Sequence, residues 1–97
     1  MMNKIENCFS EYNFDCLYRF IAEKVSAAKT TYYLYCGYEI HVSGAAELRF
    51  KKDHYTLAVI HREKGISSLA IKQADNDKIM KEVNRLFCEL IEQPGCK

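Results

Sequence analysis

Hydrophobic residues recur every three or four positions in the segment that follows Ser10. A stripe with this period is typical of an amphipathic helix that buries one face. Ser10 and Asn13 are both good N-cap residues, and the pattern fades at 29–31. The sequence therefore predicts a helix of about four turns whose apolar stripe consists of Phe14, Leu17, Phe20, Ile21, Val25 and Ala28.

From residue 32 onward the period of the pattern changes to two. Tyr32–Cys36 is rich in strand-forming residues and is followed by Gly37. Apolar and polar residues then alternate in four short segments, which are separated by turn sequences: 38–43, 48–51, 55–61 and 66–72. Strands in such quick succession predict an antiparallel meander, because a parallel crossover needs a dozen or more residues. The meander has four strands, or five if Tyr32–Cys36 is a strand of its own.

A second helical stripe occupies the last quarter of the chain. Asp75 or Asn76 is the expected N-cap, and 93–95 (Gln-Pro-Gly) stops the helix. Its apolar positions are Ile79, Val83, Leu86, Phe87 and Leu90. The predicted fold is α+β, with the order α-β-β-β-β-α and both helices packed on one face of the sheet as a two-layer sandwich. Residues 1–97 are expected to form a single domain, with 1–9 a loosely ordered lead-in and 94–97 frayed.

The other face of the predicted sheet has no helix to cover it. If the larger apolar side chains point toward the helices, this face has four cations and one carboxylate, a net charge of +3. Small residues at its centre would let a partner approach closely. Its members are then expected to be Glu39, His41, Arg49, Lys51, Thr56, Ala58, Ile60, Arg62, Ser68, Ala70 and Lys72.

Four tyrosines crowd into 32–38. Alternation places Tyr33 and Tyr35 on the opposite side from Leu34, where they are either at the edge of the core or in an interface. Tyrosine is enriched in protein interfaces because it combines a large contact area with a polar tip. An edge strand bearing these residues could also pair with a second copy of the chain, which makes a homodimer a further candidate.

The overall charge is nearly balanced, with 14 Lys and Arg against 13 Asp and Glu. This balance disfavours a general polyanion binder, because such binding scales with the number of phosphates neutralised. The positive charge is nevertheless concentrated in one part of the chain. The residues that could contact RNA or single-stranded nucleic acid are Arg49, Lys51, Lys52, Arg62, Lys64 and Lys72.

Five cysteines are present, an odd number with no closely spaced pair. The spacing does not suit a zinc site, and an odd count leaves one thiol without a disulfide partner. Reduced cysteines in a cytoplasmic protein are therefore expected, with Cys96 near the C-terminus the most exposed. The longest apolar runs are only a few residues, against about 20 for a membrane-spanning helix. No membrane association, metal or cofactor is expected.

No catalytic motif stands out. The four glycines are scattered, so no phosphate-binding loop is formed, and three histidines in the sheet region lack a partner at ligand spacing. The pattern favours a non-catalytic protein-interaction module over an enzyme. It is typical of small inhibitor, immunity or adaptor proteins of bacterial or mobile-element origin that bind a protein with an acidic surface. The expected contact residues are Tyr33, Tyr35, His41, Arg49, Lys51, Arg62 and Lys72, and the alternative is nucleic-acid binding through the basic face.

Overall fold

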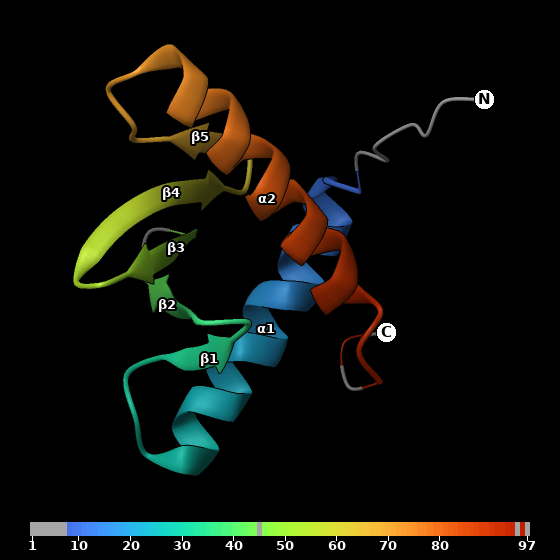
Figure 1. The fold of residues 1–97 in the computed structure, drawn as a ribbon. Coiled ribbons are helices and arrows are strands. Elements are labelled where there is room, and N and C mark those ends of the chain that lie inside the picture. The colour runs from blue at the N-terminus through green and yellow to red at the C-terminus, as the bar shows by residue number, and fades with distance from the viewer. Residues whose placement is uncertain (1–7, 45, 95, 97) are drawn as a thin grey trace.

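The chain folds in the order α-β-β-β-β-β-α (Figure 1). The computed structural model describes residues 8–44, 46–94 and 96. The elements are α1 (Glu11–Ala28), β1 (Tyr33–Tyr35), β2 (Tyr38–Ser43), β3 (Glu47–Lys52), β4 (Tyr55–His61), β5 (Gly65–Ser68) and α2 (Gln73–Ile91). The predicted α+β class is confirmed, and Tyr33–Tyr35 is the fifth strand.

The five strands form one open antiparallel sheet in the order β1-β2-β3-β4-β5, so neighbours in sequence are neighbours in space. Two of the connections are two-residue turns with positive φ at both positions. Cys36 and Gly37 have φ values of 51° and 83°, and Asp53 and His54 have values of 53° and 72°. These left-handed conformations match the twist of the flanking strands and keep each hairpin tight.

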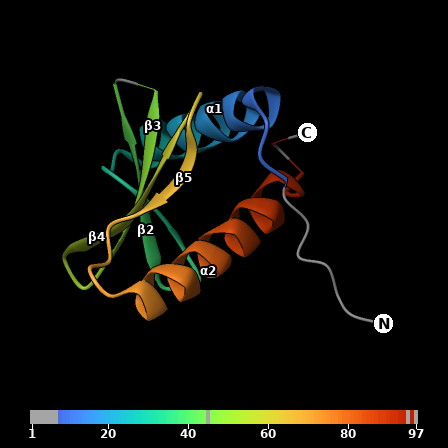
Figure 2. The same cartoon turned by 90° about the horizontal axis from the view of Figure 1, so that it is seen from above.

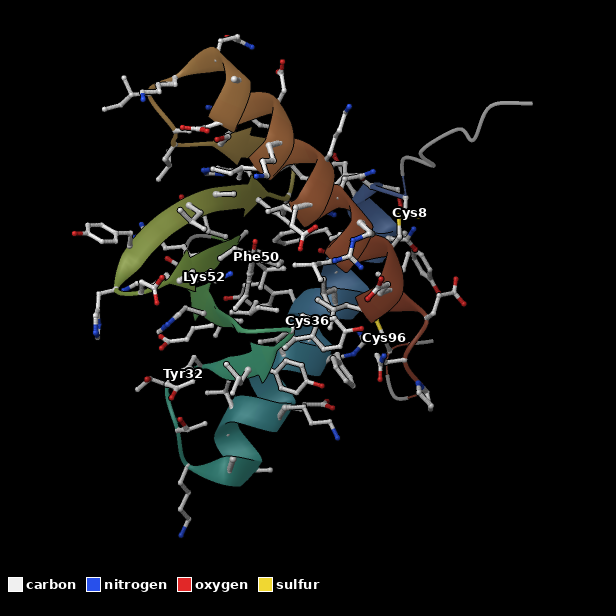
Figure 3. The ribbon with its side chains drawn as sticks, viewed as in Figure 1. Cys8, Tyr32, Cys36, Phe50, Lys52 and Cys96 are labelled. Carbon is white, nitrogen blue, oxygen red and sulfur yellow. A yellow bond between two sulfur atoms is a disulfide. The ribbon has the colours of Figure 1, made fainter. Side chains whose placement is uncertain are left out.

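Both helices lie against the same face of the sheet and diverge from each other, as the view from above shows (Figure 2). The core fills the space between them, and Phe50 points into it from β3 (Figure 3). Its largest fully buried side chains are Phe14, Phe50, Phe87, Leu17, Ile21, Ile40, Leu48, Ile60, Leu86, Leu90 and Val83. The predicted two-layer arrangement is therefore confirmed.

The helix starts were predicted with unequal success. Ser10 is the N-cap of α1, and its hydroxyl accepts a hydrogen bond of 3.0 Å from the N–H of Asn13. The expected start of α2 at Asp75 or Asn76 is wrong, because α2 begins at Gln73 and its N-cap, Lys72, makes no side-chain capping bond. β5 ends at Ser68, well before the end of the predicted strand at 66–72.

The cysteines differ from the reduced set that the sequence predicts. Cys8 and Cys88 form a disulfide across a separation of 80 residues, with their Cα atoms 5.4 Å apart (Figure 3). Cys96, expected to be exposed, is only 3% exposed and packs in the core. Neither feature has a spacing signal in the sequence, because it is the packing of the N-terminal segment on α2 that brings Cys8 to Cys88.

The two ends of the described chain lie against the core. Phe9 contacts the rings of Phe14 and Phe87, with centroid distances of 6.5 and 5.9 Å. Of the predicted lead-in and frayed end, 1–7, 95 and 97 lie outside the described residues. In the part of the chain that is described, neither helix has the length and apolar character needed to cross a membrane.

Candidate functional site

The uncovered face of the sheet is polar, but most of its charges pair with one another. Oε1 of Glu39 lies 3.1 Å from Nε2 of His41. The carboxylate of Glu47 lies 3.1 Å from Nε of Arg49 and 2.8 Å from Nε2 of His61. The charged and histidine side chains of this face are Glu39, His41, Glu47, Arg49, Lys51 and His61. Two cations therefore face two carboxylates, and the predicted net charge of +3 is wrong.

The predicted membership of the uncovered face is also wrong in β4 and β5. Ala58 and Ile60 are fully buried, because they lie opposite Phe50 and Leu48 of β3 on the helix-covered side. Ser68 pairs with Ala58 and lies on that same side. A phase error of one residue moves a whole strand to the other face. The error arose because the small size of Ala58 suits the centre of an uncovered face as well as a buried position.

Arg62 and Lys72 lie away from the uncovered face. Arg62 follows β4 and reaches α1, where its Nε lies 2.9 Å from Oδ1 of Asp15 and its Nη1 lies 3.2 Å from Oε1 of Glu11. The hydrogen bond to Asp15 and the two nearby carboxylates raise the pKa of Arg62. Lys72 is the N-cap residue of α2. Neither residue can therefore extend a surface formed by Arg49 and Lys51.

Tyr33 and Tyr35 point toward the helices, opposite Ile40 and Tyr38 in the register of β1 with β2. Both are partly buried and pack against the core. The Tyr35 hydroxyl donates a 2.9 Å hydrogen bond to Oε1 of Glu89, which raises the pKa of Tyr35 to about 12. The sequence left two alternatives for these tyrosines, the edge of the core or an interface, and the structure places them at the edge of the core.

The seven residues expected to bind a partner are thus not brought together on one surface. His41, Arg49 and Lys51 share the uncovered face, while the remaining four lie on the helix side or at an end of the sheet: Tyr33, Tyr35, Arg62 and Lys72. The nucleic-acid alternative is dispersed in a similar way. Nζ of Lys52 lies 5.1 Å from the ring centre of Tyr38, and Lys64 lies beyond Arg62 in the turn before β5.

A cleft of about 660 Å³ opens between the N-terminal half of α2 and the ends of β4 and β5. Three of its lining side chains are large, apolar and exposed. Tyr55 is 72% exposed, Leu69 is 54% exposed and Ile71 is fully exposed. The cleft is lined by Tyr38, Tyr55, Thr56, Leu57, Leu69, Ala70, Ile71, Lys72, Asp75, Lys78, Ile79 and Glu82. This is the largest group of exposed apolar side chains among the described residues.

The wall of the cleft formed by Tyr38 is more deeply buried than its mouth. Tyr38 is buried, and its ring packs edge-on against Phe50 at a centroid distance of 6.4 Å. Burial, with a smaller contribution from Glu82, raises the pKa of the Tyr38 phenol, while Arg85 opposes the shift. The cleft therefore combines a fixed aromatic wall with side chains that have no core contact to hold them.

A second depression, the β5 groove, lies on the other flank of α2. It has a volume of about 510 Å³ and runs between the start of β5 and the middle of α2. Phe9 closes one end, where its ring lies 3.8 Å from the position that a Cβ on Gly65 would take. The groove is lined by Phe9, Lys64, Gly65, Ile66, Met80, Lys81 and Asn84.

Sequence reasoning missed both depressions. The cleft has a signal, since Leu69 and Ile71 are two large apolar residues that follow directly after β5. The β5 groove has none, because Phe9, Ile66 and Met80 come from three distant parts of the chain.

Two further findings concern the chemistry of the chain. Within residues 8–44, 46–94 and 96, no three His, Cys, Asp or Glu side chains are grouped so that they could hold a metal ion. Comparison of the chain with protein-family models, with curated proteins and with solved structures finds no match.

Proposed function

We propose that this chain is a non-catalytic protein-interaction module, of the inhibitor, immunity or adaptor kind, whose cleft receives apolar side chains of a protein partner. The observation that carries the proposal is the gathering of Tyr55, Leu69 and Ile71 around one cleft. These are three of the five large apolar side chains that are exposed among the described residues. Exposed apolar side chains that cluster in this way favour contact with another protein, because burying them releases ordered water.

The exposure of these side chains favours a protein over a small molecule. A small-molecule site encloses most of its ligand within walls that are largely formed in advance. Ile71 is fully exposed and Tyr55 is 72% exposed, so these side chains could cover only one side of a small ligand. A protein surface would bury them in a single step, with Tyr38 as the fixed wall behind them.

The charges around the cleft support a partner with acidic groups. Lys72 and Lys78 line the cleft, and neither is in an ion pair with another described residue. Of the two carboxylates in the lining, Glu82 is already paired with Arg85 at 3.0 Å. One unpaired carboxylate, Asp75, thus faces two unpaired lysines, and acidic groups on a partner would be attracted to the rim.

The proposal is tested by capturing the partner from a native extract with three immobilised proteins side by side. We expect the wild type to retain a partner that the Leu69→Asp/Ile71→Asp variant loses. The matched control is Tyr12→Asp, which changes an exposed side chain (76%) on α1 and should retain the partner. Equal retention of the partner by all three proteins would show that the cleft does not bind it.

The same capture experiment separates the nucleic-acid alternative. Bound RNA would be released by nuclease and by moderate salt, since phosphate contacts weaken steeply with ionic strength. The alternative has less support, because Arg62 is paired with Glu11 and Asp15 and Arg49 with Glu47. We therefore expect nuclease treatment to leave the captured partner in place.

Two finer proposals accompany this function. A cytoplasmic location predicts that the chain is recovered in the cytoplasmic fraction of gently lysed cells, and the Cys8–Cys88 disulfide would have to resist reduction there, since disulfides persist mainly in oxidising compartments. A homodimer through β1 predicts that Leu34→Pro, which blocks an edge position, converts a dimer to a monomer in sedimentation.

A further inference from the structure

We infer that the partner contributes an extended segment that pairs with β5 as an additional strand, with apolar side chains in the β5 groove and acidic side chains beside Lys64 and Lys81. The inference rests on the proposed function and specifies how the partner is held. Addition of a strand to an exposed sheet edge supplies main-chain hydrogen bonds for affinity, and flanking pockets supply selectivity.

The backbone of β5 has hydrogen-bonding groups that face outward. The N–H of Leu69 donates to the carbonyl of Leu57 in β4 at 2.9 Å. Because bonded and non-bonded pairs alternate along an antiparallel ladder, Ser67 is bonded to β4, while Ile66 and Ser68 direct their N–H and C=O groups away from it. Among the described residues no hydrogen bond occupies these outward groups.

The outer edge of β5 is accessible in the described structure. Seen from above, no described helix or strand crosses in front of β5, and α2 lies to one side of it (Figure 2). The side chains of an added strand alternate between two faces, so every second side chain would point toward α2. There it would meet the apolar floor of the groove, which Phe9, Ile66 and Met80 provide.

The charge of the groove defines the kind of segment that fits. Lys64 and Lys81 are exposed, line the groove, and form no ion pair with any described residue. No carboxylate is among the seven lining residues, and Asp77, one helical turn before Lys81 on α2, accepts a hydrogen bond from Gln73. An acidic segment would therefore be attracted and a basic one repelled.

The first test uses peptides and follows the amide signals of the labelled protein by NMR. The probe is a seven-residue peptide in which glutamate alternates with isoleucine or valine, and its charge-reversed partner has lysine in place of glutamate. We expect the acidic peptide to shift the amides around Ile66, Ser68 and Lys81, and to bind at least about tenfold more tightly than the basic peptide. Equal binding of the two peptides, or no binding of the acidic peptide at concentrations on the order of 1 mM, would overturn the inference.

The second test isolates the main-chain pairing. The acidic peptide is made in two isomers that carry N-methyl groups either on the glutamates or on the apolar residues. Only one set of amides can face β5, so one isomer should lose binding about tenfold or more and the other should keep it. Equal affinities of both isomers and the parent peptide would exclude strand addition.

Protein variants provide matched controls. Ser68→Pro removes one outward N–H and should abolish peptide binding, whereas Ser68→Ala removes only the hydroxyl that accepts from the N–H of Ala70 and should not.

Lys64→Glu/Lys81→Glu should reverse the preference between the acidic and basic peptides. Lys24→Glu/Lys51→Glu makes the same change of charge away from the groove and should leave the preference unchanged. The peptide isomers keep the test decisive if Ser68→Pro does not fold.

The outcomes also separate this inference from the proposed function. If Leu69→Asp/Ile71→Asp loses the captured partner while the two N-methyl isomers bind alike, the module binds its partner through the cleft but not by strand addition. If a short oligouridylate shifts the groove amides more strongly than the acidic peptide, the groove is a nucleic-acid site and the inference is overturned.

Discussion

The two edge strands of the sheet lie beside different helices, β1 beside α1 and β5 beside α2, and they differ in what fills the space along them. At β1, Tyr33 and Tyr35 lean over the core, where the ring of Tyr33 packs edge-on against Phe20 at 5.7 Å and Tyr35 is tied to Glu89. At β5 the corresponding flank is a groove of about 510 Å³ with two unpaired lysines. One edge is completed by its own side chains and the other is not.

This contrast shows how a small sheet can reserve one edge for a partner. Edge strands invite unwanted pairing, and proteins limit it with short strands, charge or covering side chains. β1 is only three residues long, and two of these residues are tyrosines that cover its flank. At β5, the charges of Lys64 and Lys81 provide most of the protection from basic or neutral strands. The same charges would attract an acidic segment.

The largest effect that tests this contrast is expected from the disulfide, which holds Phe9 at the end of the β5 groove. Replacing both partners, Cys8→Ser/Cys88→Ser, should lower the free energy of unfolding by about 2–5 kcal/mol, because the bond closes a long loop in the unfolded chain. Urea denaturation followed by circular dichroism measures this change. Amide exchange should also accelerate at Phe9 and Gly65 but not in β1.

The matched control for the disulfide is Cys16→Ser/Cys36→Ser, which removes two thiols outside the bond. Reduction of the wild type should reproduce the loss of stability seen in Cys8→Ser/Cys88→Ser. If the reduced and oxidised wild type unfold at the same urea concentration, the disulfide does not support the β5 edge.

A smaller effect is expected at the β1 edge, where Tyr35→Phe removes the hydroxyl that donates to Glu89. The variant should lose about 0.5–1.5 kcal/mol at neutral pH, as is usual for one hydrogen bond. The raised pKa means that the folded state favours the protonated phenol. The stabilisation of the folded state by this hydrogen bond is therefore complete below the unfolded pKa of about 10, and it is lost as the pH rises through about 12.

The difference in stability between wild type and Tyr35→Phe should consequently shrink in strongly alkaline solution. Urea unfolding at neutral pH and in alkali would measure it, with Tyr12→Phe, on the exposed side of α1, as the control. A difference that does not depend on pH would show that the hydroxyl is not fixed by Glu89 and that the β1 edge is less complete than its geometry indicates.

The sequence predicted the parts of this fold that follow from local periodicity. The stripe from Phe14 to Ile21 is buried, Ser10 caps α1, and the alternating segment 38–43 forms β2. Each of these features depends on a few neighbouring residues. The start of α2 was misplaced because Lys72 is not a residue that normally caps a helix.

The candidate site was less predictable, because it depends on the phase of strands and on distant packing. Alternation alone could not decide which face of β4 is buried, since Ala58 and Ile60 on one side compete with Leu57 and Val59 on the other. The pairing of Ile60 with Leu48 decides it. Arg62 was placed on the sheet face because its contacts with Asp15, 47 residues earlier in the chain, have no local signature.

The smallest effect is expected on the uncovered face, between the two edges. Glu47→Gln removes the charge that faces both Arg49 and His61, and it should lower the free energy of unfolding by less than about 1 kcal/mol, because exposed ion pairs contribute little. High salt should abolish the difference from the wild type. Glu39→Gln, whose carboxylate contacts only His41 among these residues, should have a still smaller effect.

The same variant also tests whether the uncovered face takes part in binding. Most of its charges are already paired within the sheet, so Glu47→Gln should leave the binding of the acidic peptide at β5 unchanged within about twofold. The seven residues that line the β5 groove do not include Glu47 or its two partners. A loss of peptide binding in Glu47→Gln would show that the partner crosses from the β5 edge onto the sheet face. The contrast that matters would then lie between the two faces of the sheet rather than between its two edges.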